Sequence, residues 1–346
     1  MTHALEWPSL TCQFLPNIKA AGDSSSEHSL LLGTHTTGEQ NYLMVASCNL
    51  PKDDVVIDNR TQQGQGMDAS SSGGPVTSGT APMVAAYDEE RQEVGGFGHG
   101  SSNIGKIEIR MKVQHEGEVN RARYMPQNHF IVATRGPDPN VYVFDLSKHP
   151  SFPAEGSVFS PQAVCVGHSK EGYGLSWSKL TEGHLLSGSE DQTLCLWDVQ
   201  AGASGSTEKA GRQVQPLSTF KGHTSVVEDV DWHAKDKNMI ASVGDDRSIR
   251  VWDTREPQRE VHVVPNAHEG DVNCVTFNPI NEMVFATGSA DKTVALWDIR
   301  NLKTELFCTY VLRLRISHRA TVLSAEPVAK TISLIGLNVT QLTSFS

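Results

Sequence analysis

The chain has 346 residues, of which 38% are hydrophobic and 20% charged, values typical of a globular protein with one large domain or two ordinary ones. Its formal net charge of -11, with no run of Lys and Arg, disfavours direct nucleic-acid binding and favours basic partners. No apolar stretch approaches the ~18 residues of a membrane-spanning helix and the N-terminus has no signal-peptide pattern, so we expect neither membrane insertion nor secretion.

The six cysteines lie far apart in the sequence without a CxxC pair, and several stand among apolar residues. This spacing is typical of buried thiols in a reducing compartment. We therefore expect no disulfide bond, no metal and no cofactor. The cysteines are Cys12, Cys48, Cys165, Cys195, Cys274 and Cys308.

The first 58 residues contain two apolar runs bounded by turn residues, SLLLGTHT at 29–36 and NYLMVASCNL at 41–50. These runs predict β-strands, which we interpret as the outer strands of one sheet. Residues 59–93 are rich in Gly, Ser, Thr and Gln with little to bury, and they predict a disordered surface insertion. A linker with a binding role is the alternative.

Four segments of constant length follow, each beginning at a histidine and ending at an aspartate thirty positions later. In each, an aromatic residue stands nine positions after the histidine, and an aspartate stands seven positions before the end, four positions after a hydroxyl residue. The closing tripeptides are VFD, LWD, VWD and LWD. This is the WD-repeat signature and predicts an all-β propeller, with strands such as 173–177, 184–189 and 193–198. The segments are 115–145, 168–198, 223–253 and 268–298.

In the WD-repeat family that these segments resemble, a tryptophan N–H, a hydroxyl, a histidine ring and a turn aspartate form one buried hydrogen-bonded chain. In the first segment Phe144 replaces the tryptophan and donates nothing, so we expect a weaker network there. A hydrolase triad is the competing interpretation, but an active site occurs once and this set recurs in register, so we predict a structural role. The resemblance implies three full sets: Trp197, Ser187, His168 and Asp191; Trp252, Ser242, His223 and Asp246; Trp297, Thr287, His268 and Asp291.

Two further segments depart from the repeat pattern. Residues 201–211 are rich in Gly and Ser, which predicts a surface loop over roughly 201–216. After Lys303 the pattern stops, because Pro327 stands where an aromatic residue is due after His318. We therefore expect an incomplete propeller over 1–303, with four full repeats, a partial N-terminal blade and an unpaired strand at 10–14, followed by an atypical tail over 304–346.

The stretches MTHALEWPSLT, GKIEI, HEGEVNRARYMPQN and ATGSADKTVALWDIRNLK resemble the histone-binding WD-repeat family of retinoblastoma-binding proteins and chromatin assembly factor small subunits. The resemblance runs from Met1 to about Lys303. It implies a seven-bladed propeller, nuclear residence, binding of histones three and four, and membership in chromatin assembly, deacetylase, remodelling and Polycomb complexes. In that family a preceding helix and two later repeats build the groove for histone four, and we expect the chain as written to lack this groove.

Positions three and five after each histidine begin the inner strand, near the mouth of a propeller channel. Carboxylates at these positions would attract an Arg or Lys side chain, and Tyr173 could pack against its aliphatic stem. The resemblance adds Glu6 and Trp7 to this rim and Arg121 as a residue that positions the peptide backbone. A solvated acidic rim without a ligand is the alternative. The predicted peptide-binding residues are Glu6, Trp7, Glu118, Asn120, Arg121, Glu171, Tyr173, Glu228, Asp271 and Asn273.

Three functions compete for this sequence. The first is a chromatin scaffold that binds basic histone tails or similar peptides of chromatin cofactors. The second is another WD-repeat adaptor, such as a ubiquitin-ligase substrate receptor, which a histone-tail pulldown would distinguish from the first. The third is a propeller enzyme, which would need a unique polar cluster or metal set. Because the polar sets recur in every repeat, we predict that the chain is not an enzyme.

Overall fold

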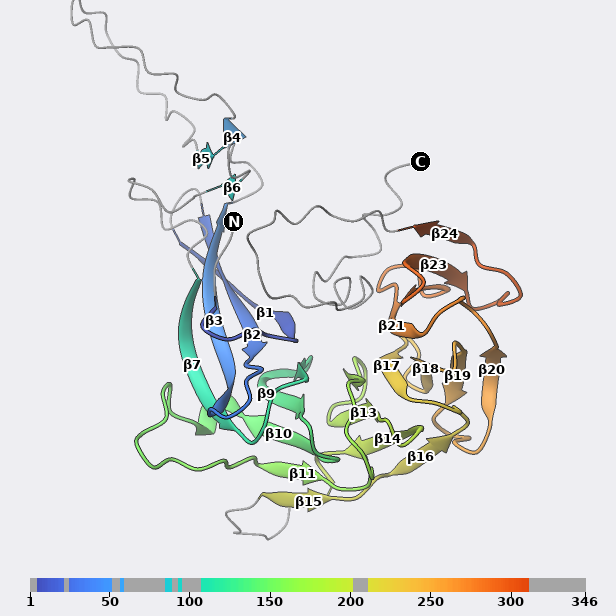
Figure 1. Cartoon of the computed structure of the whole chain (residues 1–346), viewed down its shortest axis with the longest axis horizontal. Helices are drawn as coiled ribbons and strands as arrows, with labels where there is room; N and C mark the ends of the chain where they lie inside the picture. The colour runs from blue at the N-terminus through green and yellow to red at the C-terminus, as the bar shows by residue number, and fades with distance from the viewer. Residues whose placement is uncertain are drawn as a thin grey trace, which may run out of the picture. The chain divides into compact units, whose positions relative to one another are not determined.

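The computed structural model describes residues 5–21, 25–51, 57–58, 85–88, 93–94, 107–201 and 211–310. These residues form β-strands and connecting turns, with one short 3-10 helix at Leu146–Lys148, so the fold is all-β (Figure 1). The chain divides into two compact units. The first comprises Met1–Glu6, Phe14–Leu30 and Val45–Arg110, and the second comprises Trp7–Gln13, Leu31–Met44 and Met111–Ser346.

The first sheet has the strand order β1-β2-β3-β7, and its strands are shared between the two units. The apolar runs at 29–36 and 41–50 supply β2 and β3, but these are the middle strands and not the outer ones, because β7 lies beside β3. The prediction of an unpaired N-terminal strand is also wrong, because β1 neighbours β2. The strands are β1 (Cys12–Ala20), β2 (Ser25–Gly33), β3 (Asn41–Pro51) and β7 (Ile107–His115).

A small three-stranded sheet lies in the sequence between β3 and β7. It consists of β4 (Ile57–Asp58), β5 (Ala85–Asp88) and β6 (Glu93–Val94). β4 pairs parallel with β5, and β5 pairs antiparallel with β6. The predicted insertion at 59–93 thus contains β5 and the first residue of β6, and its other residues lie outside the described ranges.

Each WD repeat contributes the first three strands of one sheet, as the sequence predicts. The second sheet, in the order β15-β11-β10-β9-β8, consists of β8 (Arg121–Met125), β9 (Asn128–Arg135), β10 (Val141–Asp145), β11 (Ala163–Cys165) and β15 (Arg212–Val214). The third consists of β12 (Leu175–Trp177), β13 (His184–Gly188), β14 (Thr193–Asp198) and β16 (Ser218–Lys221). The predicted loop at 201–216 contains β15, which pairs parallel with β11; residues 202–210 lie outside the described ranges.

The last two sheets repeat the same four-stranded order. The fourth consists of β17 (Val227–Trp232), β18 (Met239–Gly244), β19 (Ile249–Asp253) and β20 (Glu260–Val264). The fifth consists of β21 (Val272–Phe277), β22 (Val284–Ser289), β23 (Thr293–Asp298) and β24 (Phe307–Tyr310). Since β24 supplies the outer strand of the fifth sheet, the start of the predicted tail is part of the fold; residues 311–346 lie outside the described ranges.

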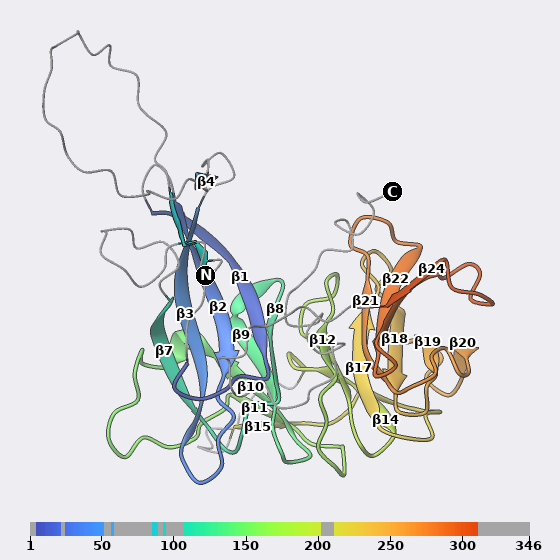
Figure 2. The ribbon, with the colours of Figure 1, turned by 45° about the horizontal axis from the view of Figure 1, so that its top comes forward.

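The inner strands of neighbouring WD sheets contact one another in chain order. β8 packs on β12, β12 on β17, and β17 on β21 (Figure 2). The constant spacing of the repeat aromatics supports these junctions, because Trp177 Nε1 donates to the carbonyl of Arg123 at 2.8 Å and Trp232 Nε1 donates to the carbonyl of Ser176 at 3.1 Å. Each of these indoles therefore joins its own inner strand to the inner strand of the preceding sheet.

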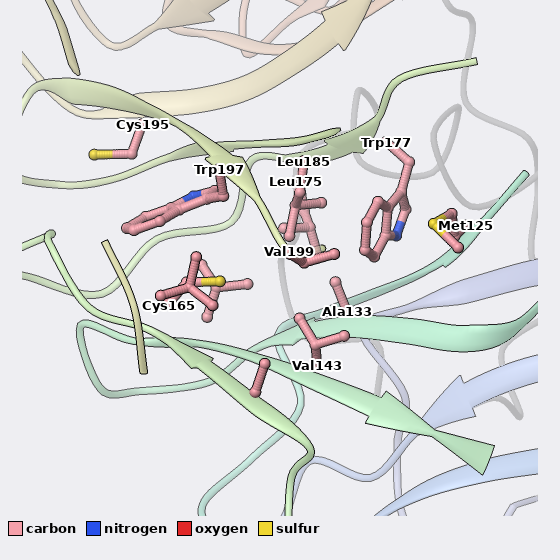
Figure 3. Packing of buried hydrophobic residues seen from close by; sticks show 13 residues of the cluster. Met125, Ala133, Val143, Cys165, Leu175, Trp177, Leu185, Cys195, Trp197 and Val199 are labelled. Carbon is pink, nitrogen blue, oxygen red and sulfur yellow. The ribbon is translucent and has the colours of Figure 1, made fainter. Parts of the chain in front are cut away.

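The hydrophobic core lies between the faces of adjacent sheets. Leu185 and Leu186 are both fully buried but pack in different clusters, since successive strand residues point to opposite faces. Leu185 joins Trp177, Trp197 and Val143 in the cluster between the second and third sheets (Figure 3). Burying each such side chain contributes about 1.5–3 kcal/mol, so every WD sheet is stabilised mainly by its neighbours.

The predicted hydrogen-bonded chain is confirmed in the last three repeats. In the third sheet Trp197 Nε1 donates to Ser187 Oγ at 2.8 Å, Ser187 lies 2.8 Å from His168 Nε2, and His168 Nδ1 lies 3.1 Å from Asp191. Because the hydroxyl accepts from the indole, it donates its own proton to the histidine, which leaves Nδ1–H to donate to the carboxylate. A neutral histidine therefore satisfies every member. The corresponding sets of the fourth and fifth sheets have the same partners at 2.7–3.1 Å.

The first repeat differs more than the loss of tryptophan predicts. His115 Nε2 contacts Thr134 Oγ1 at 2.9 Å, but His115 Nδ1 bonds the carbonyl of Gly117 at 3.0 Å in place of the turn aspartate. That aspartate, Asp138, instead accepts from the Tyr142 hydroxyl and from Asn140. The prediction of a weaker network holds, and the aspartate as well as the tryptophan is missing from it.

The six cysteines are free thiols. Burial raises the pKa of Cys165 and of Cys274 to about 12, so both thiols are protonated at neutral pH. In the part of the chain that the structure describes, no helix is long and apolar enough to cross a membrane.

Candidate functional site

The predicted site residues of the repeats stand where the inner strands begin. Glu118 and Asn120 precede β8, Glu171 and Tyr173 precede β12, and the third pair is represented by Glu228 in β17. Asp271 precedes β21, and Asn273 is its second residue. The register therefore places these seven residues at equivalent ends of four inner strands, all in the second unit.

Two of these strand ends bring polar groups together. Asn120 Nδ2 donates to Glu171 Oε2 at 3.5 Å, which links the second sheet to the third. Burial raises the pKa of Glu171, and the carboxylates of Glu190 and Glu118 raise it further. Three carboxylates are thus close enough to repel one another, and a cation placed among them would relieve that repulsion.

The backbone around Glu171 is fixed by the turn that follows β13. The carbonyl of Glu171 accepts from the Ser189 hydroxyl at 2.8 Å and from the Glu190 N–H at 2.9 Å. Gly172 is required for this close approach, because a Cβ there would lie 2.2 Å from the carbonyl oxygen of Gly188. The orientation of Glu171 and Tyr173 is therefore set by the fold and not by a flexible loop.

Arg121 has its partners inside the protein. Its side chain is buried, its Nε donates to the carbonyl of Tyr173 at 3.0 Å, and its Nη2 lies 3.7 Å from Asp229 Oδ1. One guanidinium thus connects the second, third and fourth sheets. The contact with a peptide backbone expected from the sequence is replaced by this positioning role.

Asp229 and Asp231 in β17 were not identified from the sequence. Asp229 Oδ2 accepts from the Val275 N–H at 3.2 Å, and Asp231 Oδ2 accepts from the Phe277 N–H at 2.9 Å. Burial raises the pKa of Asp229, although Arg121 and Arg123 partly offset that effect. Two acidic residues at alternate positions of an otherwise apolar strand were the available signal, because buried carboxylates require partners.

Arg123 is the second buried cation of β8. Burial lowers its pKa to about 9, and the nearby Arg121 lowers it as well. Its Nη1 donates to Thr11 Oγ1 at 3.2 Å, while the same hydroxyl accepts from the Ala122 N–H at 2.9 Å. Within the second unit, the segment around Thr11 is therefore bonded to the inner strand of the second sheet.

The remaining predicted residues have more varied environments. Asp271 is exposed and Glu228 is half-buried, whereas Asn273 is buried and its Nδ2 has no hydrogen-bond partner among the described residues. Trp7 is half-buried in the second unit, and Glu6 is exposed in the first. The structure thus brings together Glu118, Asn120 and Glu171 by side-chain interactions and links Arg121 to Tyr173, while the others share only the strand-end position or the N-terminal segment.

The arrangement offers carboxylate oxygens, an amide and an aromatic ring, which are groups that bind cations and peptides. Among the described residues, no group of three or more His, Cys, Asp and Glu side chains is arranged to hold a metal ion. Comparison with protein families gives two matches. Residues 1–52 match the family of the histone-binding protein RBBP4 and its counterpart in the CAF1 complex. Residues 159–198, 214–253 and 258–298 match the WD domain, G-beta repeat.

Proposed function

Because the chain is a WD-repeat protein that matches a histone-binding WD-repeat family, we propose that it is a scaffold subunit that binds basic, histone-tail-like peptides. Its partners are histones three and four and Arg- or Lys-bearing peptides of chromatin cofactors. It acts by binding and not by catalysis, since the Ser, His and Asp groups of its repeats are bonded to one another in register. We place it in the nucleus, in chromatin assembly, remodelling, deacetylase or Polycomb complexes.

The group formed by Glu118, Asn120 and Glu171 is the observation that carries this proposal. An Arg or Lys side chain entering beside Glu171 would replace carboxylate repulsion by attraction, in surroundings that water screens less than an open surface. Asn120 supplies a neutral donor and acceptor at the same place. The charge of -11 on the whole chain would also speed the encounter with a basic peptide.

The neighbouring strand ends extend this binding surface. Tyr173, whose carbonyl is held by Arg121, presents a ring for the aliphatic stem of the bound side chain. Asn273 has a buried amide N–H that a peptide carbonyl would satisfy. Glu228 and Asp271 supply two further carboxylates, and Glu6 and Trp7 complete the proposed set.

Charge reversal tests the proposal. The Glu171→Lys, Glu228→Lys double variant should bind a fluorescent histone three tail peptide at least about tenfold more weakly than the unmodified chain, and its affinity should depend less on salt. Fluorescence anisotropy at two or more salt concentrations measures both effects. The matched control is Glu155→Lys, Glu256→Lys, which makes the same charge change at two exposed acids outside the site. Equal loss in both double variants, or unchanged affinity in the first, would refute the assigned site.

A further inference from the structure

A cavity of about 450 Å³ lies at the fifth sheet, away from the strand ends of the proposed peptide site. Three of its lining residues present oxygen acceptors: Asp291 and Thr293 near the start of β23, and Glu305 just before β24. Ala295 in β23 and Ala267, which precedes the repeat histidine, also line it. The volume is sufficient for the end of a long side chain.

The fourth sheet contains an arginine at the equivalent place. Arg250 Nη1 pairs with Glu260, its Nη2 lies 3.7 Å from Asp246 Oδ2, and its Nε donates to Ser248 Oγ at 3.2 Å. The guanidinium is partly buried, with 13% of the side chain exposed. Three oxygen acceptors thus hold one cation against the repeat network of the fourth sheet.

The repeat register shows that the fifth sheet keeps these acceptors. Asp246 and Ser248 stand seven and five positions before the closing Asp253, as Asp291 and Thr293 do before the closing Asp298. Glu260 and Glu305 each follow their closing aspartate by seven positions, and each carboxylate acts on the histidine of its own repeat. The two sets of acceptors are therefore equivalent.

The cation is the member that differs. Arg250 stands three positions before its closing aspartate, and Ala295 occupies that position in the fifth sheet. Asp291 has the same intramolecular donors as Asp246, namely the histidine ring, the next backbone N–H and the following hydroxyl residue. The oxygen that meets Arg250 in the fourth sheet thus faces a cavity in the fifth.

The charge of the cavity favours a cation. Asp291, Glu269 and Glu305 line it together with one arginine, Arg247. Burial lowers the pKa of the fifth lining group, His268, so it is neutral at neutral pH. Carboxylates therefore outnumber cations in the lining, which disfavours an anionic ligand and favours a positively charged one.

We propose that this cavity is a receptor for the guanidinium group of an arginine side chain, bound by Asp291, Thr293 and Glu305 as Arg250 is bound by Asp246, Ser248 and Glu260. The arginine comes from a partner peptide or from this chain, whose sequence beyond Tyr310 contains Arg313, Arg315 and Arg319. Both sources offer the same chemistry. This site is independent of the proposed peptide site at the inner strand ends.

The experiment uses the full chain with Glu171→Gln and Glu228→Gln, so that the proposed peptide site does not contribute. Ligand-observed NMR measures binding of N-acetyl-arginine amide and of its neutral analogue N-acetyl-citrulline amide. We expect the arginine probe to bind at least about tenfold more tightly than the citrulline probe, because the charged donors face carboxylates. Glu305→Gln should weaken the arginine probe severalfold.

A reconstruction of the fourth-sheet arrangement provides the decisive variant. Gly222 precedes the histidine of the fourth sheet, and a Cβ there would lie 2.9 Å from Arg250 Nη1, so an arginine at 295 also needs glycine at 267. The Ala267→Gly, Ala295→Arg variant should abolish binding of the arginine probe and raise the melting temperature. Ala267→Gly alone is the matched control and should keep the probe.

An additional variant distinguishes the two sources of arginine. If the probe binds only after Arg313, Arg315 and Arg319 are changed to Gln, the chain fills its own cavity and the proposal stands with an internal ligand. If it binds without that change, the ligand is external. Absence of binding in both backgrounds, or binding that persists in Ala267→Gly, Ala295→Arg or in Glu305→Gln, would overturn the proposal.

Discussion

At the scale of the residue, the turn aspartates have a larger role than their exposed positions in the sequence suggest. Asp246 accepts from His223 at 2.9 Å and from the Thr224 N–H at 3.1 Å. Burial opposes ionisation of this carboxyl, but the bonds from His223 and Ser248 outweigh burial and hold its pKa below the usual range. The charge of Asp246 is therefore part of the folded structure.

Substitution of this aspartate should be costly. Asp246→Ala leaves the buried His223 Nδ1–H and the Arg250 guanidinium without their acceptor, and should lower the free energy of unfolding by about 1–3 kcal/mol. Denaturant titration followed by tryptophan fluorescence measures the change. The control is Asp253→Ala, because Asp253 bonds the exposed Arg255 and its loss should cost no more than about 0.5 kcal/mol. Similar losses in both variants would contradict the structural role of Asp246.

The same networks predict how stability depends on pH. Burial lowers the pKa of the four repeat histidines, although their acceptors partly offset it. The unfolded chain takes up protons near 6.5 and the folded chain does not, so this contribution is present above pH 6.5 and is lost as the pH falls below it. Asp246 contributes in the same direction, with stability present above 3.8 and lost as the pH falls through its lowered pKa.

We therefore expect the melting temperature to fall when the pH is lowered from about 7.5 to about 5, and to fall again below about 3.8. Scanning calorimetry or circular dichroism at constant ionic strength measures the shift. His223→Gln should reduce the dependence between pH 7.5 and 5, because one of the titrating groups is removed. A melting temperature that rises on acidification would show that the histidines are charged in the folded state.

At the scale of the element, the four repeats have the same strands but not the same hydrogen bonds. Thr287 in β22 accepts from the Trp297 indole and contacts the His268 ring, whereas Thr134 in β9 contacts His115 and has no indole beside it. Phe144 fills the place of the indole and packs on His115 with ring centroids 5.9 Å apart. The second sheet thus replaces a hydrogen bond by an aromatic contact.

The two threonines allow a matched test of this difference. Thr287→Val removes the acceptor of one indole and the partner of one histidine, whereas Thr134→Val affects one histidine alone. Both side chains are buried and the replacement conserves shape. We expect Thr287→Val to be the more destabilising by about 1–2 kcal/mol, measured by chemical denaturation. Equal costs would mean that the indole bond adds nothing to the stability of the sheet.

The strand pattern of the WD sheets could be predicted because it depends on local spacing. The turn between the second and third strands begins after a fixed number of residues, and Gln192, Arg247 and Lys292 occupy the same turn position with positive φ. The positions of β7 and β15 could not be predicted in this way. Both pair with strands that precede a long insertion or a neighbouring sheet, and nothing in their local sequence specifies the partner.

At the scale of the whole molecule, buried charges join sheets that are distant in the sequence. Arg121 contacts Tyr173 and Asp229, and Asp229 also accepts from Val275, so one chain of bonds runs through the second to fifth sheets. The pair has 8% and 10% of its side chains exposed. Removing one charge from so enclosed a pair leaves the other uncompensated.

A double-mutant cycle should reveal this coupling. Asp229→Leu alone should destabilise the protein by about 3–5 kcal/mol, because Arg121 and Arg123 lose their shared acidic neighbour. Adding Arg121→Met should cost less than the sum of the two single changes, since the buried guanidinium is then removed as well. Denaturant unfolding of the four proteins measures the coupling energy. Additive effects would show that the pair does not couple the sheets.

The candidate site was predictable in its positions and not in its partners. The histidine register placed Glu118, Glu171 and Asn273 at inner strand ends, and the structure has them there. The register could not show that Arg121 is used inside the protein, because its acceptors come from two other sheets. Asp229 was missed for the same reason, since its role depends on what lies across the junction between sheets.

The sequence by itself determined the repeats, their strands and the bonds within each repeat, because those partners are separated by constant intervals that a β-sheet converts into fixed distances. The tertiary structure alone decided which groups meet between repeats. The neighbourhood of Glu118 and Glu171, the partners of Arg121 and the cavity beside Ala295 all depend on how one sheet faces the next. Packing between sheets sums many side-chain contacts from distant segments, and no local spacing encodes that sum.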